Sequence, residues 1–279
     1  MKHIIFFPNE LGQKRTGIKE TVKLIYEQYF YNIYNNSYFI KCNNTSLKNN
    51  LLKLYKKNIQ LLSNNSNKII NIGGDHSMAI ASIAASLNIH GTKLKVLWFD
   101  AHGDINTRQS SSTGNYHGMP LSFLTGLDNS SDFNYIKNKL IFNNLCYIGI
   151  RDLDPEESST IKLYNIKNIK AKQFNNFINK YTKDIIEWIG DSPLHLSFDV
   201  DSLDPKYMEY TGTRAPNGLE LDKVLVCLKE VCTKINIVNV DLTELNLFNP
   251  DLNPHNFEKQ LYSLNAFLSI FNVIYNNMQ

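Results

Sequence analysis

One stretch constrains this chain more than any other: a short apolar strand that runs into three alternating polar side chains. Residues 95–99 are rich in strand-forming residues, and Asp100, His102 and Asp104 follow directly. In an extended backbone, side chains two positions apart point to the same side, so these three would project together from the end of the strand. Such a group is unsuited to a core, and the pattern predicts a metal site.

The rest of the chain alternates between short apolar runs typical of strands and periodic runs typical of helices. We expect strands at 3–7, 38–41, 68–72, 95–99, 146–150, 194–198 and 235–240, and helical segments at 18–29, 47–62, 80–87, 174–189, 221–231 and 257–275. This alternation predicts an α/β fold of three layers, with helices on both faces of a mostly parallel sheet. The chain has 279 residues, 43% of them hydrophobic, and no Pro/Gly/Ser-rich linker, so we expect one domain over residues 1–279.

Composition argues against several other classes of protein. The formal charge is only +3 and the lysines are scattered, which gives no support for a nucleic-acid partner. The apolar run at 4–7 stops at Pro8, too short for a signal peptide, and no run is long enough to span a membrane. Four cysteines, Cys42, Cys146, Cys227 and Cys232, lie in or directly beside expected strands and helices without close pairing. We interpret them as reduced thiols and expect a cytoplasmic location.

Polar clusters follow several of the expected strands at their carboxyl ends. Besides the Asp100 cluster they are His76, Asp154, Asp199 with Asp201, and Glu244. A single aspartate at such a place could equally cap a helix or close a turn. Ligands of parallel α/β sheets bind beyond the carboxyl ends of the strands, so five clusters at that edge predict one shared site.

Six of these side chains are candidate metal ligands: His76, Asp100, His102, Asp104, Asp199 and Asp201. Four carboxylates placed together carry more negative charge than a site can hold without cations. Two divalent ions would neutralise them, and carboxylate–imidazole ligands without thiolates favour Mn²⁺ over Zn²⁺, Fe²⁺ or Co²⁺. Two metal ions about 3.5–4 Å apart are the usual device for hydrolysis by a bridging hydroxide.

Three motifs resemble the metal motifs of the ureohydrolase family, which includes the arginases and agmatinases. They are Gly-Gly-Asp-His-Ser at 73–77, Asp-Ala-His-Gly-Asp at 100–104 and Ser-Phe-Asp-Val-Asp-Ser-Leu-Asp-Pro at 197–205. The resemblance runs from about Gly12 to the final helix and implies the arginase fold with two Mn²⁺ per subunit. It implies one ion on His76 and Asp104, the other on His102 and Asp201, and Asp100 and Asp199 as bridges.

The same resemblance implies roles for residues around the reacting group. A metal-bridging hydroxide, oriented by Asp104, would attack the guanidinium carbon of the substrate. Glu244, in Asp-Leu-Thr-Glu-Leu-Asn, matches the glutamate that pairs with the guanidinium. His117, in Gly-Asn-Tyr-His-Gly, matches the proton-shuttle histidine. Thr213, in Thr-Gly-Thr, is expected to support Glu244.

Substrate choice depends on the loop at 106–120, which resembles the arginase version rather than the agmatinase version. Asn106, Thr113 and Asn115 match residues that bind the α-carboxylate of the substrate. Asp154 matches the residue that meets the α-ammonium, with Glu157 assisting through water. Agmatine has no carboxylate, and buried polar groups left unpaired reject a substrate strongly. The resemblance therefore favours hydrolysis of L-arginine to L-ornithine and urea.

Two alternatives stay open. One is an agmatinase, or another guanidino or formimino hydrolase of the same family. The other is a non-catalytic binding or regulatory member, which would be expected to have lost ligands, whereas all six are present. Family members form trimers or dimers of trimers, so we expect a homotrimer or hexamer. Arg108 in the substrate loop, and Arg214 where the family has proline, receive no role from the sequence.

Overall fold

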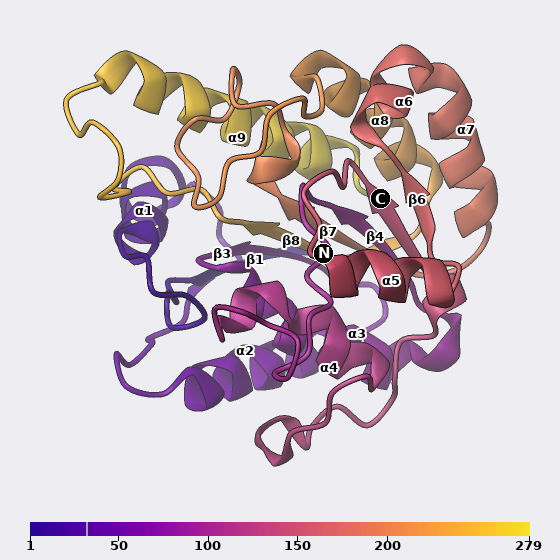
Figure 1. The fold of residues 1–279 in the computed structure, drawn as a ribbon. Coiled ribbons are helices and arrows are strands. Elements are labelled where there is room, and N and C mark those ends of the chain that lie inside the picture. Colours follow the sequence, from indigo (N-terminus) through magenta and orange to yellow (C-terminus); the bar gives the residue numbers. More distant parts are fainter. Residues whose placement is uncertain (32) are drawn as a thin grey trace.

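An eight-stranded sheet in which all neighbouring strands are parallel runs through the middle of the protein (Figure 1). The computed structural model describes residues 1–31 and 33–279. The order of the strands is β2-β1-β3-β8-β7-β4-β5-β6. Their bounds are β1 Lys2–Phe7, β2 Ser37–Phe39, β3 Lys68–Gly73, β4 Lys95–Phe99, β5 Leu145–Ile148, β6 Lys167–Ile169, β7 Leu194–Asp199 and β8 Ile237–Thr243.

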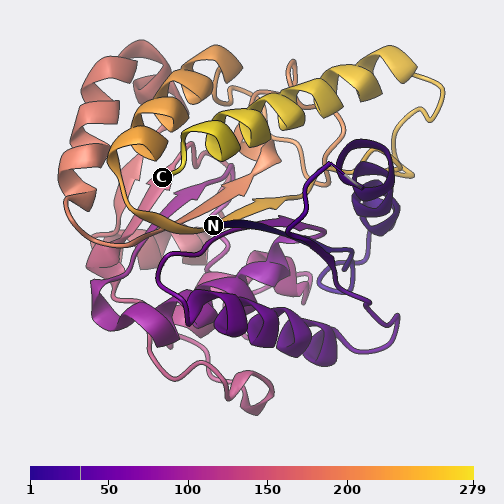
Figure 2. The same cartoon turned by 180° about the vertical axis from the view of Figure 1, so that it is seen from behind.

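Helices cover both faces of this sheet. Their bounds are α1 Ile18–Ile25, α2 Leu47–Leu62, α3 Ala79–His90, α4 Pro120–Thr125, α5 Pro155–Leu163, α6 Ala171–Asn176, α7 Ile178–Ile189, α8 Leu221–Lys234 and α9 Phe257–Asn277. Figures 1 and 2 show α2, α3 and α4 on one face and α6, α7, α8 and α9 on the other. The predicted three-layer α/β fold is thus confirmed. No helix in the described part of the chain is both long and apolar enough to cross a membrane.

Each face of the sheet has its own hydrophobic core. Strand β4 shows how the sequence builds both: Leu97 and Phe99 pack into the core beneath α8 and α9, and Val96 and Trp98 into the core beneath α2 and α3. All four side chains are fully buried. Because helices cover both faces, a central strand needs apolar residues at successive positions, which explains the apolar runs in the sequence.

Three features differ from the sequence-based expectation. Helix α5 and strand β6 were not expected, because α5 (Pro-Glu-Glu-Ser-Ser-Thr-Ile-Lys-Leu) buries only Glu157 and Ile161 and so has little apolar periodicity. Its start is set instead by proline in the first turn and by a capping box between Asp154 and Glu157. The helix expected at 174–189 is interrupted at Phe177, which separates α6 from α7.

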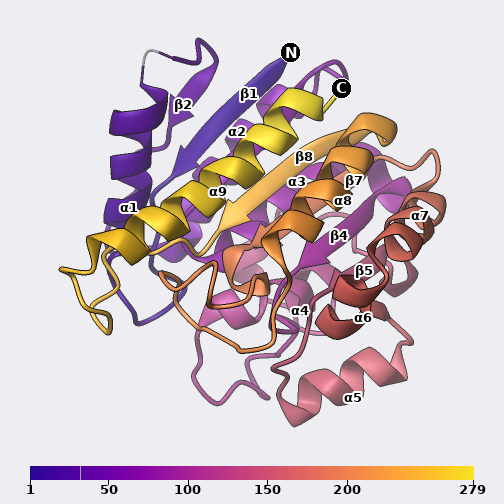
Figure 3. The same cartoon turned by 90° about the horizontal axis from the view of Figure 1, so that it is seen from above.

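The order of the strands explains how distant motifs meet. Strands β3, β8, β7 and β4 are consecutive neighbours at the centre of the sheet, and the polar clusters follow each of them. Figure 3 looks onto the face covered by α8 and α9, which lie side by side over these strands. The two termini lie near one another in Figures 2 and 3. The clusters therefore share the carboxyl edge of four adjacent strands.

Candidate metal centre and substrate pocket

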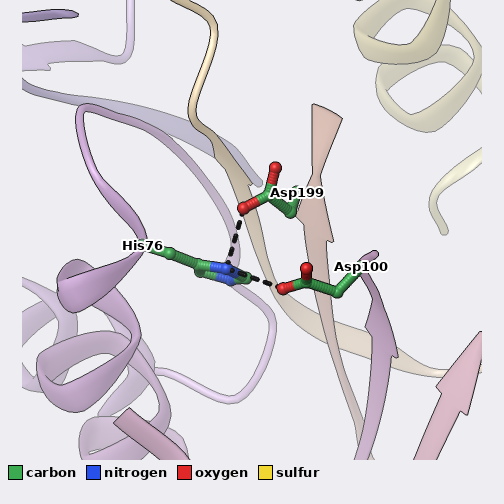
Figure 4. A group of neighbouring side chains, drawn as sticks. All are labelled: His76, Asp100 and Asp199. Atoms are coloured by element: carbon green, nitrogen blue, oxygen red, sulfur yellow. Dashed lines mark ion pairs between the residues drawn. The ribbon is translucent and has the colours of Figure 1, made fainter. Parts of the chain in front are cut away.

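Five of the six predicted metal ligands fall into two adjacent groups, and the sixth, Asp104, lies beside His76. His76, Asp100 and Asp199 form one, and Asp100, His102 and Asp201 form the other. In each group the potential ligand atoms lie within 4.8 Å of one another, and Asp100 belongs to both. Figure 4 shows the imidazole of His76 facing the carboxylates of Asp100 and Asp199. The two groups are thus arranged to hold two metal ions side by side.

His76 has the geometry of a metal ligand. Its Nδ1 lies 3.2 Å from Asp100 Oδ2, 3.0 Å from Asp104 Oδ2 and 3.1 Å from Asp199 Oδ2. This nitrogen is buried and makes no hydrogen bond to any described residue, whereas Nε2 lies 2.8 Å from Ser197 Oγ. When Nε2 donates its hydrogen to that hydroxyl, Nδ1 keeps a lone pair directed at three carboxylate oxygens. A cation among these four atoms would satisfy all of them.

The second group is held in place by its neighbours. His102 Nδ1 lies 3.1 Å from Asp201 Oδ2 and 3.4 Å from Asp100 Oδ1. Asp100 is oriented by two donors, the indole Nε1 of Trp98 at 2.9 Å from Oδ2 and the backbone N–H of His102 at 2.7 Å from Oδ1. Trp98 also stacks on His76, with 4.2 Å between the ring centres. One aromatic side chain therefore supports ligands of both groups.

The electrostatics of the cluster indicate the same requirement for cations. Burial, together with the charge of Asp100, raises the pKa of Asp104 to about 6. Burial and the neighbouring carboxylates also raise the pKa of Asp199, and burial raises that of Asp201. Without positive charge, these carboxylates therefore resist full ionisation. The donor set, all oxygen and imidazole nitrogen, fits two divalent metal ions.

A cavity of about 670 Å³ opens onto this centre. The predicted catalytic and substrate-binding residues all line it: His117, Asp104, Glu244, Asn106, Thr113, Asn115, Asp154, Glu157 and Thr213. Three further ligands, His102, Asp199 and Asp201, line the same cavity. Loops that are up to about 140 positions apart in the sequence thus line one cavity, which also contains the metal ligands.

Glu244 is buried in the wall of this cavity and receives three hydrogen bonds at its carboxylate. The backbone N–H of His76 donates to Oε1 at 2.8 Å, and His117 Nδ1 lies 3.2 Å from the same oxygen. The side-chain amide of Gln13 donates to Oε2 at 2.9 Å. The sequence reasoning missed Gln13, although the glycines at 12 and 17 that bracket its turn were a signal of a special backbone there.

His117 lies in a short turn at 116–118 opposite Glu244. Burial alone would lower the pKa of His117, but the hydrogen bond and charge of Glu244, with the charges of Asp104 and Asp75, raise it to about 9. The backbone N–H of His117 donates to the carbonyl oxygen of Gly12 at 3.1 Å. The imidazole is therefore held beside Glu244 and is protonated at neutral pH in the metal-free protein.

Two residues of the site have an unusual backbone. Asp104 has a φ of 49° and Glu244 a φ of 68°, both in the left-handed region that residues other than glycine rarely adopt. Glu244 is fixed by its N–H to the carbonyl of Gly74 at 3.0 Å, and its own carbonyl accepts from Thr211 Oγ1 at 3.0 Å. Strained backbone of this kind is typical of functional sites, where surrounding contacts hold it.

The residues expected at the amino-acid end of the substrate contact one another. Asn106 Nδ2 donates to Asp154 Oδ2 at 2.8 Å, and Asn106 Oδ1 accepts from Ser110 Oγ at 2.8 Å. Both oxygens of Glu157 accept backbone N–H groups, from Ile105 at 3.2 Å and Asp154 at 3.1 Å. Glu157 therefore holds the two loops together, a structural use that the sequence did not indicate.

Three other residues are now placed. Thr213 is exposed at the pocket rim. Among the described residues, the hydrogen bonds to the carboxylate of Glu244 come from Gln13, His76 and His117 and none comes from Thr213, so its support of Glu244 stays a prediction. Arg108 pairs with Asp128, with 2.7 Å between Nη2 and Oδ1, and does not line the cavity. Arg214 is exposed, 3.9 Å from Glu209.

Comparison with known proteins agrees with this geometry. The model of the arginase family matches residues 6–261. An arginase of Staphylococcus aureus is 35% identical over 219 residues, which cover 77% of this chain and 72% of that protein. An arginase of Neurospora crassa is 41% identical over 192 residues, 64% of this chain but only 53% of that protein, so the alignment spans about half of its length.

The fold is also that of solved arginases. A crystal structure of Entamoeba histolytica arginase in complex with L-ornithine superposes with a TM-score of 0.86, at 27% identity, covering 98% of this chain and 97% of that one. The family match extends over nearly the whole chain, and the fold and the paired ligand groups agree with it. The protein therefore belongs to the arginase family.

Proposed function

We propose that this protein hydrolyses L-arginine to L-ornithine and urea, using two Mn²⁺ ions per subunit. One observation carries the proposal: Asp100 joins two metal-ligand groups beneath a cavity whose wall presents the buried carboxylate of Glu244. A dinuclear hydrolytic centre and an anionic partner for a planar cation thus face the same space. The relatives named arginase support the same substrate.

The two groups, together with the family resemblance, indicate which residues would hold each ion. His76, Asp104, Asp100 and Asp199 would hold one ion, and His102, Asp201, Asp100 and Asp199 the other. When bound, two such cations would lower the pKa of a coordinated water molecule and so would supply hydroxide near neutral pH. Asp104 lines the cavity as well as facing His76, so its carboxylate is placed to accept a hydrogen bond from the nucleophile and orient it.

Glu244 binds the guanidinium group of the substrate. A carboxylate and a guanidinium form paired hydrogen bonds in one plane, which fixes the guanidinium carbon in space. The backbone N–H of His76, itself a metal ligand, holds Glu244 Oε1. The anchor for the substrate and the metal site are therefore joined by one hydrogen bond, and this keeps the reacting carbon at a fixed position relative to the metal centre.

His117 supplies the proton that the leaving group needs. An amine leaves a tetrahedral carbon readily only when its nitrogen is protonated as the C–N bond breaks. A pKa raised to about 9 in the metal-free protein keeps the imidazole protonated, and it lies beside the residue that binds the guanidinium. His117 then gives its proton to the leaving nitrogen and regains one from the next water molecule.

The amino-acid end of the substrate is bound at the pocket rim. Asn106, Thr113 and Asn115 line the cavity and offer neutral donors for the α-carboxylate, and Asp154 offers a carboxylate for the α-ammonium. Asn106 and Asp154 are joined by a hydrogen bond, so the groups for the α-carboxylate and for the α-ammonium are positioned together. Agmatine, with no carboxylate, would leave the donors unpaired.

Urea release by manganese-loaded protein, with L-arginine and agmatine assayed side by side, tests the proposal. We expect urea from L-arginine and about tenfold less or lower from agmatine, since agmatine lacks the carboxylate that the donors of Asn106, Thr113 and Asn115 would bind. Urea from agmatine alone would support the proposed hydrolytic centre but would overturn the substrate-binding roles of Asn106, Thr113 and Asn115. Folded, metal-loaded protein that releases urea from neither compound would overturn the proposed reaction.

We further propose that the active form is a homotrimer or hexamer, as the family resemblance implies, and that it is cytoplasmic, as the four free cysteines indicate. The mass of the purified protein in solution, measured by light scattering, tests the assembly. The 32.1 kDa chain would give a particle of three or six times that mass. A monomer at micromolar concentration would contradict it.

A further inference from the structure

Gln13 is a buried polar residue with no part in the metal site and no role assigned from the sequence. Its side chain is 9% exposed, and its amide nitrogen donates to Glu244 Oε2 at 2.9 Å, across 231 positions of sequence. An ionised carboxylate can only accept hydrogen bonds, so the amide nitrogen, not the amide oxygen, must face Glu244. A neutral donor buried against a charged acceptor is a strong contact.

The backbone next to Gln13 is fixed on two sides. The N–H of Gly12 donates to Asp75 Oδ2 at 2.9 Å, and the carbonyl of Gly12 accepts from the N–H of His117 at 3.1 Å. A side chain at Gly12 would collide with Asp75 and Ser77, so the loop can approach this closely only with glycine there. The loop that carries Gln13 therefore has little freedom to move, and it holds the Gln13 side chain against Glu244.

Gln13 supplies what the other two donors to Glu244 lack. His76 N–H and His117 Nδ1 both contact Oε1, so neither of them holds the second oxygen of the carboxylate. Gln13 alone among the described side chains holds Oε2. Gly212 lies against this pair: a Cβ there would be 3.2 Å from Glu244 Oε2 and 3.5 Å from Gln13 Oε1.

We propose that Gln13 is a positioning residue that fixes the plane of the Glu244 carboxylate and so sets the affinity of the pocket for a guanidinium group. This inference rests on the proposed role of Glu244 as the partner of the guanidinium. Paired hydrogen bonds require the carboxylate and the guanidinium to share a plane. A carboxylate held in that plane before the substrate arrives loses less entropy on binding.

The test compares manganese-loaded wild-type protein with Gln13→Met, which keeps the side-chain length and removes the donor. Gln60→Met, at an exposed position of α2, is the matched control. Two ligands are compared. For L-arginine we measure kcat and KM of urea release. For L-norvaline, which has the amino-acid end but no guanidinium, we measure Kd by calorimetry. We expect Gln13→Met to lower kcat/KM at least tenfold, mainly through KM, and to change the L-norvaline Kd less than twofold.

The outcomes separate a positioning role from a structural one. Equal losses for both ligands, or an unchanged KM for L-arginine, would overturn the proposal. If Gln13→Met fails to fold, Gly212→Ala tests the same point. The added methyl group presses on Glu244 Oε2 and should weaken the binding of L-arginine but not that of L-norvaline. If wild-type protein releases no urea, the proposed reaction is wrong, but the role of Gln13 can still be tested. L-Arginine is then not consumed, and its calorimetric Kd is compared between wild type and Gln13→Met. Failure of L-arginine to bind to wild type would overturn the inference.

Discussion

The side-chain amide of Asn106 donates a 2.8 Å hydrogen bond to the carboxylate of Asp154, 48 positions later in the chain. By the family resemblance, Asn106 matches a residue that binds the α-carboxylate of the substrate and Asp154 matches one that binds its α-ammonium. Their contact means that a change at one end disturbs the other. With the roles proposed for Asn106 and Asp154, we therefore expect recognition of the α-carboxylate and of the α-ammonium to be coupled.

This coupling predicts a non-additive pair of substitutions. We expect Asn106→Ala and Asp154→Ala each to raise KM for L-arginine about tenfold or more, and the double variant to raise it less than the product of the two. Steady-state urea release measures all four proteins of the cycle. Independent effects, with a coupling below about 0.3 kcal/mol, would show that the contact has no part in binding. Ser269→Ala, on α9, should leave KM unchanged.

Ser197 offers a prediction about metal binding. Its hydroxyl lies 2.8 Å from His76 Nε2 and can hold the hydrogen there, which keeps the lone pair on Nδ1 for the metal. We expect Ser197→Ala to weaken manganese binding about 10- to 100-fold, as loss of a partner that orients a histidine ligand typically does. Calorimetric titration of the metal-free protein with Mn²⁺ measures this. An affinity equal to that of the wild type would mean that packing against Trp98 alone orients the ring.

The His117–Glu244 pair predicts a pH dependence of stability in the metal-free protein. The pKa of His117 is raised to about 9 in the folded state, against 6.5 in its ordinary state. The stabilisation is therefore complete below about pH 6.5 and is lost as the pH rises through about 9, and it is worth at most about 3 kcal/mol.

Urea unfolding of metal-free wild type and His117→Gln at pH 6 and pH 9.5 measures this effect. The free energy of unfolding should differ between the two proteins more at pH 6 than at pH 9.5. An NMR titration of the His117 ring should give a midpoint above pH 8. A midpoint near 6.5 would show that Glu244 does not hold the proton on the imidazole.

A buried polar network below the site predicts a large loss of stability. Asp241 accepts from Asn71 Nδ2 at 2.8 Å, from the hydroxyl of Ser82, and lies 2.9 Å from His195 Nε2, and all four side chains are fully buried. We expect Asp241→Leu to lower the free energy of unfolding by about 3–5 kcal/mol, because it leaves buried donors without an acceptor.

Chemical unfolding of the metal-free protein measures that loss. Asp222→Leu, at an exposed position in the first turn of α8, is the control and should cost less than about 1 kcal/mol. A loss below about 1 kcal/mol for Asp241→Leu would mean that the network rearranges around the leucine.

The sequence by itself determined the parts of this protein that depend on local periodicity. Helix α2 begins and ends at the predicted residues, Leu47 and Leu62, because its apolar stripe is long and regular. The alternation of Asp100, His102 and Asp104 placed three ligands on one side of the chain without any knowledge of their neighbours. Helix α5 escaped prediction because caps, rather than an apolar face, define it.

Only the tertiary structure decided which loops meet. The contacts of Gln13 with Glu244, and of Asn106 with Asp154, join segments whose separation in the sequence carries no periodic signal. Gln13 reaches Glu244 because the order of the strands brings the loop after β1 against the loop after β8. Periodicity records which face of an element is buried, whereas partners between loops follow from how the strands are ordered in the sheet.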